Sequence, residues 1–284
     1  MRRSTLLCLP LLALTTSSAL MASSANAAAV SPPGVNLRWD NCYGDGGAWN
    51  KNFACDTNSG SEALVCSFEL DQSFSEASGA EIYLDLSSQS VSLPPWWTYK
   101  NAGACRQASL GAAFLTAPPG SRNCIDWAQG QGMGGIAAYA VGYHGPSTAR
   151  IIAGIAVPPS GLVTLVPGQE YFALSVTINH AKTVGTGSCA GCTVPVCIFL
   201  QRIVIVTPPV AGQPSRDLLL ERGANDSGSQ YATWQNGYPI NIQRECDPPP
   251  YETCFKHYNS FDCVLATPTS SRGSTWGRVK SLYR

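Results

Sequence analysis

The sequence predicts an all-β protein, a disulfide-stapled antiparallel β-sandwich of the immunoglobulin-like or jelly-roll-like kind. Three observations predict it. Apolar and polar residues alternate in short runs, as in strands with one buried face. Glycine (27 residues) and proline (20) are abundant while charged residues make up 13%, which favours strands and turns over helices. Cysteines are dense behind an export signal, which is typical of a disulfide framework.

The alternating runs give the positions of the expected strands. In residues 81–86 every second side chain is apolar, so one face of that strand is expected to be buried. The same period of two recurs at 35–39, 64–70 and 172–178. Residues 151–157 and 197–206 are apolar almost throughout, which is typical of central strands. Turns rich in proline and glycine separate these runs.

Composition divides the chain into four segments. They are a signal peptide (1–27), the β-sandwich body (28–206), a linker with added edge strands and a Cys-rich loop (207–265), and a flexible tail (266–284). Within the third segment, Asn236-Gly237 separates two β-prone runs and predicts a hairpin over 231–243.

The tail is expected to end in a short basic-aromatic helix. Trp276, Val279 and Tyr283 recur at helical spacing after a polar stretch, among basic residues and no acidic ones. Such a helix suits a docking or sorting element, and a frayed terminus is the alternative. The sequence leaves open whether the tail is a sorting signal.

The first residues have the three parts of a secretion signal. Arg2 and Arg3 form a positive start, residues 6–14 are apolar, and Ala25-Asn26-Ala27 is a small-residue cleavage site. Residues 15–18 are polar and leave the apolar run short of the roughly 20 residues that a membrane-spanning helix needs. No later segment qualifies as a span. The mature chain is therefore expected to be secreted or at the cell surface, with the periplasm as the alternative compartment.

The charge balance argues against a nucleic-acid partner. The chain has 18 basic and 18 acidic residues, and loss of Arg2 and Arg3 with the signal leaves 16 against 18, a net charge of −2. A nearly neutral protein lacks the basic footprint that phosphate backbones require.

Eleven cysteines follow the signal and are the disulfide candidates. They are Cys42, Cys55, Cys66, Cys105, Cys124, Cys189, Cys192, Cys197, Cys246, Cys254 and Cys263. As working guesses, near neighbours pair as Cys42–Cys55, Cys105–Cys124 and Cys254–Cys263. The odd number leaves one thiol unpaired, and we expect it in the crowded trio at 189, 192 and 197.

That trio has C-x2-C-x4-C spacing, which can also hold zinc or perform redox exchange. Zinc would need a fourth ligand, and the sequence offers no second C-x2-C or H-x3-H pair. A redox C-x2-C normally begins a helix of an α/β fold, which is not predicted here. Structural disulfides are therefore the favoured interpretation.

No cofactor is expected from the sequence, and calcium is the alternative that it leaves open. Asp56, Asn58 and Glu62 carry oxygen ligands at alternate positions, like the start of a calcium loop, and Asp40 or Asp45 could add more. The glycine and the final glutamate of a full loop are missing. A turn rich in Asp and Asn is the alternative.

The most suggestive binding segment is aromatic. Trp96, Trp97 and Tyr99 follow two prolines. If exposed, they would form a platform on which sugar rings stack, or a hot spot for a protein partner. If buried, they would plug the end of the sandwich.

No catalytic residue is assigned from the sequence. His144, His180 and His257 are scattered, and neither a G-x-S-x-G nor an H-E-x-x-H motif occurs. A Ser-His-Asp site needs no fixed order, and two acids could be paired by folding, so a hydrolase stays open.

Three stretches carry a resemblance to a known group. They are LRWDNCYGDGGAWNKNFACDTNSG, SCAGCTVPVCI and the ending TWGRVKSLYR. The chain resembles a group of uncharacterised exported bacterial proteins with a Cys-rich β-domain and a C-terminal TWGxxKxxYR tail. The resemblance covers most of the mature chain and implies export and a β-rich fold, but no activity.

These features predict a secreted or cell-surface, non-enzymatic binding or structural β-sandwich. Its partner would be an extracellular protein or glycan. The alternatives are a secreted hydrolase acting on polysaccharides or esters, and a carbohydrate-binding module that uses Trp96, Trp97 and Tyr99. The sequence leaves the ligand and the oligomeric state open.

Overall fold

The computed structural model describes residues 33–114, 121, 123–211, 216–220, 229–245 and 257–265. Over these residues the chain consists almost entirely of β-strands and turns, which confirms the predicted all-β class. The predicted signal peptide (1–27) and tail (266–284) lie outside the described residues. In the described part, no helix has both the length and the apolar character needed to cross a membrane.

The strands, in chain order, are β1 (Gly34–Trp39), β2 (Asn50–Lys51), β3 (Ser61–Glu69), β4 (Phe74–Ala77), β5 (Gly79–Ser88), β6 (Leu110–Ala113), β7 (Cys124–Asp126), β8 (Met133–Val141), β9 (Thr148–Ala156), β10 (Val163–Leu165), β11 (Glu170–Asn179), β12 (Val196–Val206), β13 (Leu218–Leu220), β14 (Tyr231–Trp234), β15 (Gly237–Glu245) and β16 (His257–Leu265). Two short 3-10 helices are η1 (Pro95–Trp97) and η2 (Pro159–Gly161).

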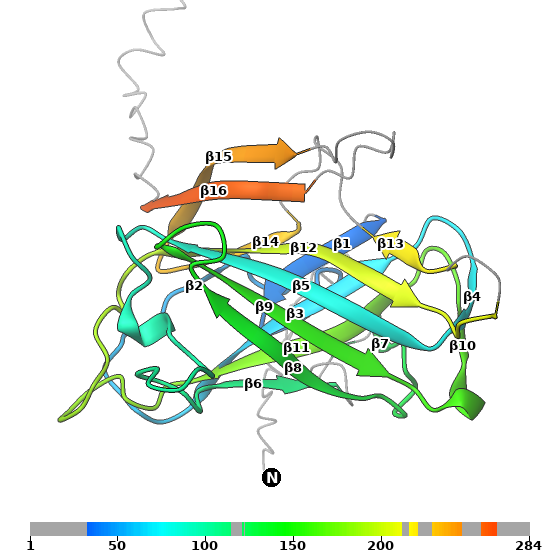
Figure 1. The fold of residues 1–284 in the computed structure, drawn as a ribbon, viewed down its shortest axis with the longest axis horizontal. Coiled ribbons are helices and arrows are strands. Elements are labelled where there is room, and N and C mark those ends of the chain that lie inside the picture. The colour runs from blue at the N-terminus through cyan, green and yellow to red at the C-terminus, as the bar shows by residue number, and fades with distance from the viewer. Residues whose placement is uncertain are drawn as a thin grey trace, which may run out of the picture.

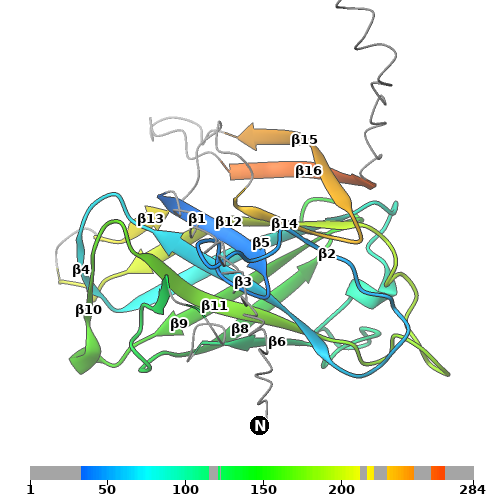
Figure 2. The same ribbon diagram turned by 180° about the vertical axis from the view of Figure 1, so that it is seen from behind.

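Two sheets face each other and form a sandwich (Figure 1, Figure 2). The first sheet has the order β1-β3-β11-β6, with β7 also paired to β11. The second sheet has the order β2-β14-β12-β5-β9-β8, with β13 also paired to β12. Most pairs are antiparallel, and the parallel ones are β7 with β11 and β2 with β14. The predicted disulfide-stapled sandwich is confirmed.

The core lies between the sheets and follows the alternation seen in the sequence. In β5, Ile82, Leu84 and Leu86 are buried in the core, while Glu81 is exposed and Tyr83 is half-buried. The first sheet supplies the facing apolar side chains from β3 and β11. Burial of each such side chain contributes about 1.5–3 kcal/mol, so the period of two fixes which face of each strand turns inward.

The predicted hairpin over 231–243 is wrong, and the turn lies one residue earlier than the predicted Asn236-Gly237. Gln235 and Asn236 both have positive φ (54° and 57°), as a tight two-residue turn requires. The flanking strands then separate, because β14 pairs with β12 and β15 pairs with β16. The β15–β16 pair lies above the sandwich in Figure 1 and is bonded to β12 by the Cys197–Cys263 disulfide.

Four disulfides join distant parts of the described chain. They are Cys42–Cys124, Cys55–Cys192, Cys105–Cys189 and Cys197–Cys263, with sequence separations of 82, 137, 84 and 66. The three guessed local pairings are therefore wrong. A sandwich brings together loops that are far apart in sequence, so cysteines that are neighbours along the chain bond to different loops. Loops of this length correspond to about 4–5 kcal/mol each in the chain-entropy account.

The unpaired thiol is also not where the sequence placed it. Cys189, Cys192 and Cys197 are each bonded to a distant cysteine, so in the oxidised protein none of them is a free thiol or a zinc ligand, and Cys189 and Cys192 do not form a C-x2-C disulfide. Among the described residues the free cysteine is Cys66, which is buried in the core. Burial raises the pKa of its thiol, so Cys66 is an inert apolar side chain. The candidates at 246 and 254 lie outside the described residues.

Candidate functional site

The aromatic segment expected to bind sugars is buried inside the molecule. Trp96, Trp97 and Tyr99 are each 0% exposed, so no ring face is available to a ligand. Helix η1 turns the two indoles inward against Trp234, with ring centroids 5.2 and 5.6 Å away. Trp39 packs on Trp234 at 5.8 Å. The structure supports the plug that was the alternative interpretation.

A buried cation completes this cluster. The Arg106 guanidinium lies 3.5 Å from the centroid of the Trp96 ring and donates to the carbonyl oxygens of Trp96, Ala181 and Asn179. Burial lowers the pKa of Arg106, and the neighbouring Tyr99 partly opposes this effect. Ring faces and carbonyl dipoles stabilise the charge. We call Trp39, Trp96, Trp97, Trp234 and Arg106 the tryptophan end.

Two of the three proposed calcium ligands, Asn58 and Glu62, have protein partners. The Asn58 carboxamide oxygen accepts hydrogen bonds from the backbone amides of Thr183 and Val184, at 2.7 and 3.0 Å. Glu62 pairs with Lys51 and His180. Asp56 is exposed. Two of the three predicted ligands therefore hold loops and strands together, and the expectation of calcium at Asp56, Asn58 and Glu62 is not supported.

His180 belongs to a network of polar side chains. Its Nε2 lies 3.0 Å from Glu62 Oε1, and its Nδ1 lies 2.6 Å from the Ser59 carbonyl oxygen. Lys51 bridges Glu62 and Asp40 at 2.6 and 2.8 Å. Partial burial lowers the pKa of Lys51, but the bonds to both carboxylates outweigh it and raise the pKa overall. This network connects β2, β3 and the end of β11.

His144 lies beside a carboxylate that is already occupied. Asp85, in β5, receives two hydrogen bonds of 2.6 Å from Arg150 in β9, and His144 Nε2 lies 3.2 Å from Asp85 Oδ2. The Arg150 guanidinium also covers the Tyr143 ring at 3.9 Å. Within the described residues, neither His144 nor His180 is hydrogen-bonded to a serine hydroxyl. The side chain of residue 257 is not among those described.

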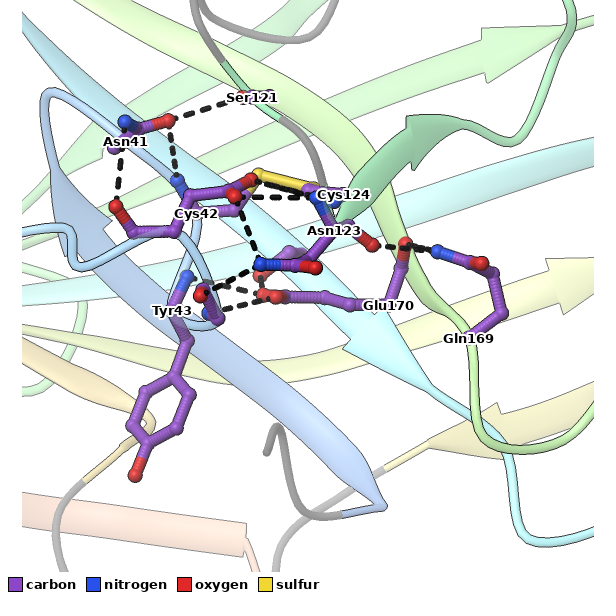
Figure 3. The surroundings of a disulfide bond; sticks show 11 residues. Asn41, Cys42, Tyr43, Ser121, Asn123, Cys124, Gln169 and Glu170 are labelled. Atoms are coloured by element: carbon purple, nitrogen blue, oxygen red, sulfur yellow. Dashed lines mark hydrogen bonds between the residues drawn. A yellow bond between two sulfur atoms is a disulfide. The ribbon is translucent and has the colours of Figure 1, made fainter. Parts of the chain in front are cut away.

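Glu170 is a buried carboxylate next to the Cys42–Cys124 disulfide (Figure 3). It is 3% exposed and accepts hydrogen bonds from the backbone amides of Tyr43 and Gly44, at 3.0 and 2.8 Å, and from the Ser67 hydroxyl at 2.5 Å. Burial raises the pKa of Glu170 although these three bonds lower it. The carboxylate thus fixes the loop after β1 onto the first sheet.

The same three residues meet the distance criterion for a metal site. One Glu170 oxygen and the sulfurs of Cys42 and Cys124 lie within 4.8 Å of one another. Because the two sulfurs are bonded to each other, they are not the thiolates that a metal ion requires. This cluster is therefore a structural anchor in the oxidised protein.

An open, mainly apolar hollow of about 470 Å³ lies where β9 and β12 end and β5 and β8 begin. Its lining consists of Ser78 to Glu81, Met133, Gly154 to Ala156, Val206, Thr207 and Pro209. Met133 at its rim is 80% exposed. This hollow differs from the clusters above because its surface is accessible and its polar groups are few.

Strand β8 adjoins the hollow and forms one edge of the second sheet. Its sequence, MGGIAAYAV, has no charged residue and no proline, and most of its residues are exposed or half-buried. Natural edge strands are usually short, charged, covered or interrupted by proline, because unpaired backbone groups attract other strands. Strand β8 is nine residues long, and among the described residues its guards are a bulge between Ile136 and Ala138 and the Asn101 side chain, which bonds to the Tyr139 carbonyl oxygen.

The other edges of the two sheets are guarded. In β1 the backbone amide of Leu37 donates to the Ser229 carbonyl oxygen at 2.7 Å, and Arg38 donates to the same oxygen. Strands β2 and β6 have two and four residues. The β8 edge and the hollow together are therefore the candidate site. Neither was predicted from the sequence, because glycine-rich strands are unusual. The signal that could have indicated β8 is its run of nine uncharged residues.

Comparisons of the chain with protein-family models, with curated proteins and with solved structures find no match.

Proposed function

We propose that the protein is an exported, non-enzymatic binding module whose binding surface is the β8 edge with the adjoining hollow. The observation that carries the proposal is the exposed, uncharged nine-residue edge strand beside an open apolar hollow. A protein is the favoured partner, because an open edge offers backbone groups that pair with another strand. The aromatic rings that would have favoured a glycan are buried.

Export and durability are supported by the covalent framework. Disulfides that join loops 66 to 137 residues apart persist in oxidising compartments and slow unfolding where chaperones are absent. The signal-like start of the sequence and its resemblance to exported Cys-rich proteins agree with this. The partners of Asp85, Glu62 and Glu170 support a structural role for these carboxylates, because each is hydrogen-bonded to neighbouring elements.

Binding of the fluorescent probe anilinonaphthalenesulfonate tests whether the hollow is an accessible apolar site. Gly154→Glu places a charge in the hollow, where an added Cβ has no atom nearer than 4.0 Å. The control, Val91→Glu, changes a residue that is 92% exposed and does not line the hollow. We expect the first variant to lose most of the probe fluorescence and the control to keep it, with near-UV circular dichroism unchanged in both.

Two outcomes would contradict the proposal. Equal probe fluorescence in the wild type and in Gly154→Glu would show that the hollow is not the binding surface. The hydrolase alternative predicts turnover of a chromogenic aryl ester or aryl glycoside that falls when His144 is replaced by alanine, and such turnover would overturn the non-enzymatic part.

A further inference from the structure

We propose that β8 pairs antiparallel with β8 of a second copy of this chain, so that two second sheets join into one continuous sheet. This inference rests on the proposed function and names the partner at the same surface. Its basis is the backbone of β8, because an edge strand presents unpaired N–H and C=O groups along its outer side. Strand β9 occupies the other side of β8 in antiparallel register, with a shift between Ile136 and Ala138.

The available part of the edge is short and well defined. The Asn101 side chain donates to the Tyr139 carbonyl oxygen at 3.1 Å and so covers the edge at that position. From Met133 to Ala138 no hydrogen bond to a side chain or to a backbone group outside the sheet occurs among the described residues. Pairing is therefore expected over this stretch.

The symmetry of an antiparallel self-pair centres it on Gly135. A two-fold axis perpendicular to the sheet places one residue opposite itself, with neighbours paired outward on both sides. Centred on Gly135, the pair sets Met133 of each copy opposite Ala137 of the other and stays clear of Tyr139. A Cβ built at Gly135 has no atom within 4 Å, so the centre of the contact is unobstructed.

The chemistry of β8 favours a second copy over an unrelated peptide. Peptides that add to a sheet edge gain specificity from side-chain pockets along it, whereas β8 offers mainly glycine and alanine. An uncharged strand is complementary to itself, and a chain with 18 basic and 18 acidic residues has little net charge to keep copies apart. Strands β1, β2 and β6 of the two main sheets are short or covered, so β8 is the edge of these sheets on which a second copy can pair.

The test is the oligomeric state of the full exported chain and of charge variants at the centre, measured by sedimentation velocity. Gly135→Lys sets two like charges opposite each other and is expected to raise the dimer dissociation constant by about fivefold or more. Gly135→Glu should do the same, and an equimolar mixture of the two variants should restore the dimer. The control, Gly111→Lys on the edge strand β6, should leave the dimer unchanged, since an added Cβ there has its nearest atom at 3.9 Å.

A wild-type protein that sediments as a monomer across the concentration series would overturn the self-pairing, and so would a mixture that stays monomeric. If Gly111→Lys were monomeric while the Gly135 variants stayed dimeric, the dimer contact would lie on the first sheet. None of these results affects the probe-binding test of the hollow, so failure of the dimer and failure of the proposed function are distinguishable.

Discussion

The tryptophan end and the β8 edge use opposite kinds of residues. At the tryptophan end, large rings surround a buried guanidinium whose donors are matched by carbonyl oxygens. At the β8 edge, glycine and alanine leave outward-pointing backbone groups without partners among the described residues. The aromatic residues of the tryptophan end therefore stabilise the fold, whereas the glycine and alanine residues of β8 form an accessible surface.

The largest expected effect is at the tryptophan end. Trp234→Ala removes the ring on which Trp39, Trp96 and Trp97 all pack, and is expected to lower the free energy of unfolding by about 3–5 kcal/mol. Chemical denaturation measures this. The matched control, Trp49→Ala, changes an indole that is 48% exposed and should cost no more than about 0.5 kcal/mol. Equal losses in the two variants would contradict the assignment of a structural role to the cluster.

A smaller loss is expected at the buried cation. Arg106→Lys keeps the charge but removes the planar fork, so carbonyl oxygens lose their donors and stability should fall by about 2–3 kcal/mol. The same substitution at Arg202, whose guanidinium lies 4.3 Å from the centroid of the Tyr83 ring, should cost about 0.5–1 kcal/mol. Thermal and urea unfolding of both variants checks the difference. Full tolerance of lysine at 106 would show that the fork geometry is unimportant.

The sequence was sufficient to predict the strands whose side chains alternate. The runs at 64–70, 81–86 and 172–178 correspond to β3, β5 and β11, because a period of two can be satisfied only by a strand with one buried face. The continuously apolar runs at 151–157 and 197–206 became β9 and β12 of the second sheet. Local patterning alone was enough for these elements.

The pairing of distant segments could not be predicted in the same way. Cys55 bonds to Cys192 across 137 residues, and nothing local distinguishes it from a partner nearby. A turn was recognisable at Asn236-Gly237, yet it forms one residue earlier, at Gln235 and Asn236, and β14 pairs with β12. Trp96 and Trp97 could have faced either way, and Arg106 gave no sign of burial because its partners are backbone carbonyls contributed by the fold.

The β8 edge was overlooked for a related reason. Gly134 and Gly135 are poor strand formers, and their interpretation depends on what lies beside them. The folded structure was needed to show that this run is the edge of a seven-stranded sheet. It was also needed to show that Asn101 covers the Tyr139 carbonyl oxygen and that Met133 borders the hollow.

Hydrogen–deuterium exchange at two protein concentrations tests the central claim about β8 most directly. In dilute solution, the outward-pointing amides of Met133 to Ala138, which are not bonded to β9, are expected to exchange much faster than those of β12, which has paired strands on both sides. At high concentration the same β8 amides should become protected while β12 is unchanged, because a second copy covers the edge. Exchange in β8 that is independent of concentration, or as slow as in β12 when dilute, would contradict an open edge that pairs with another copy.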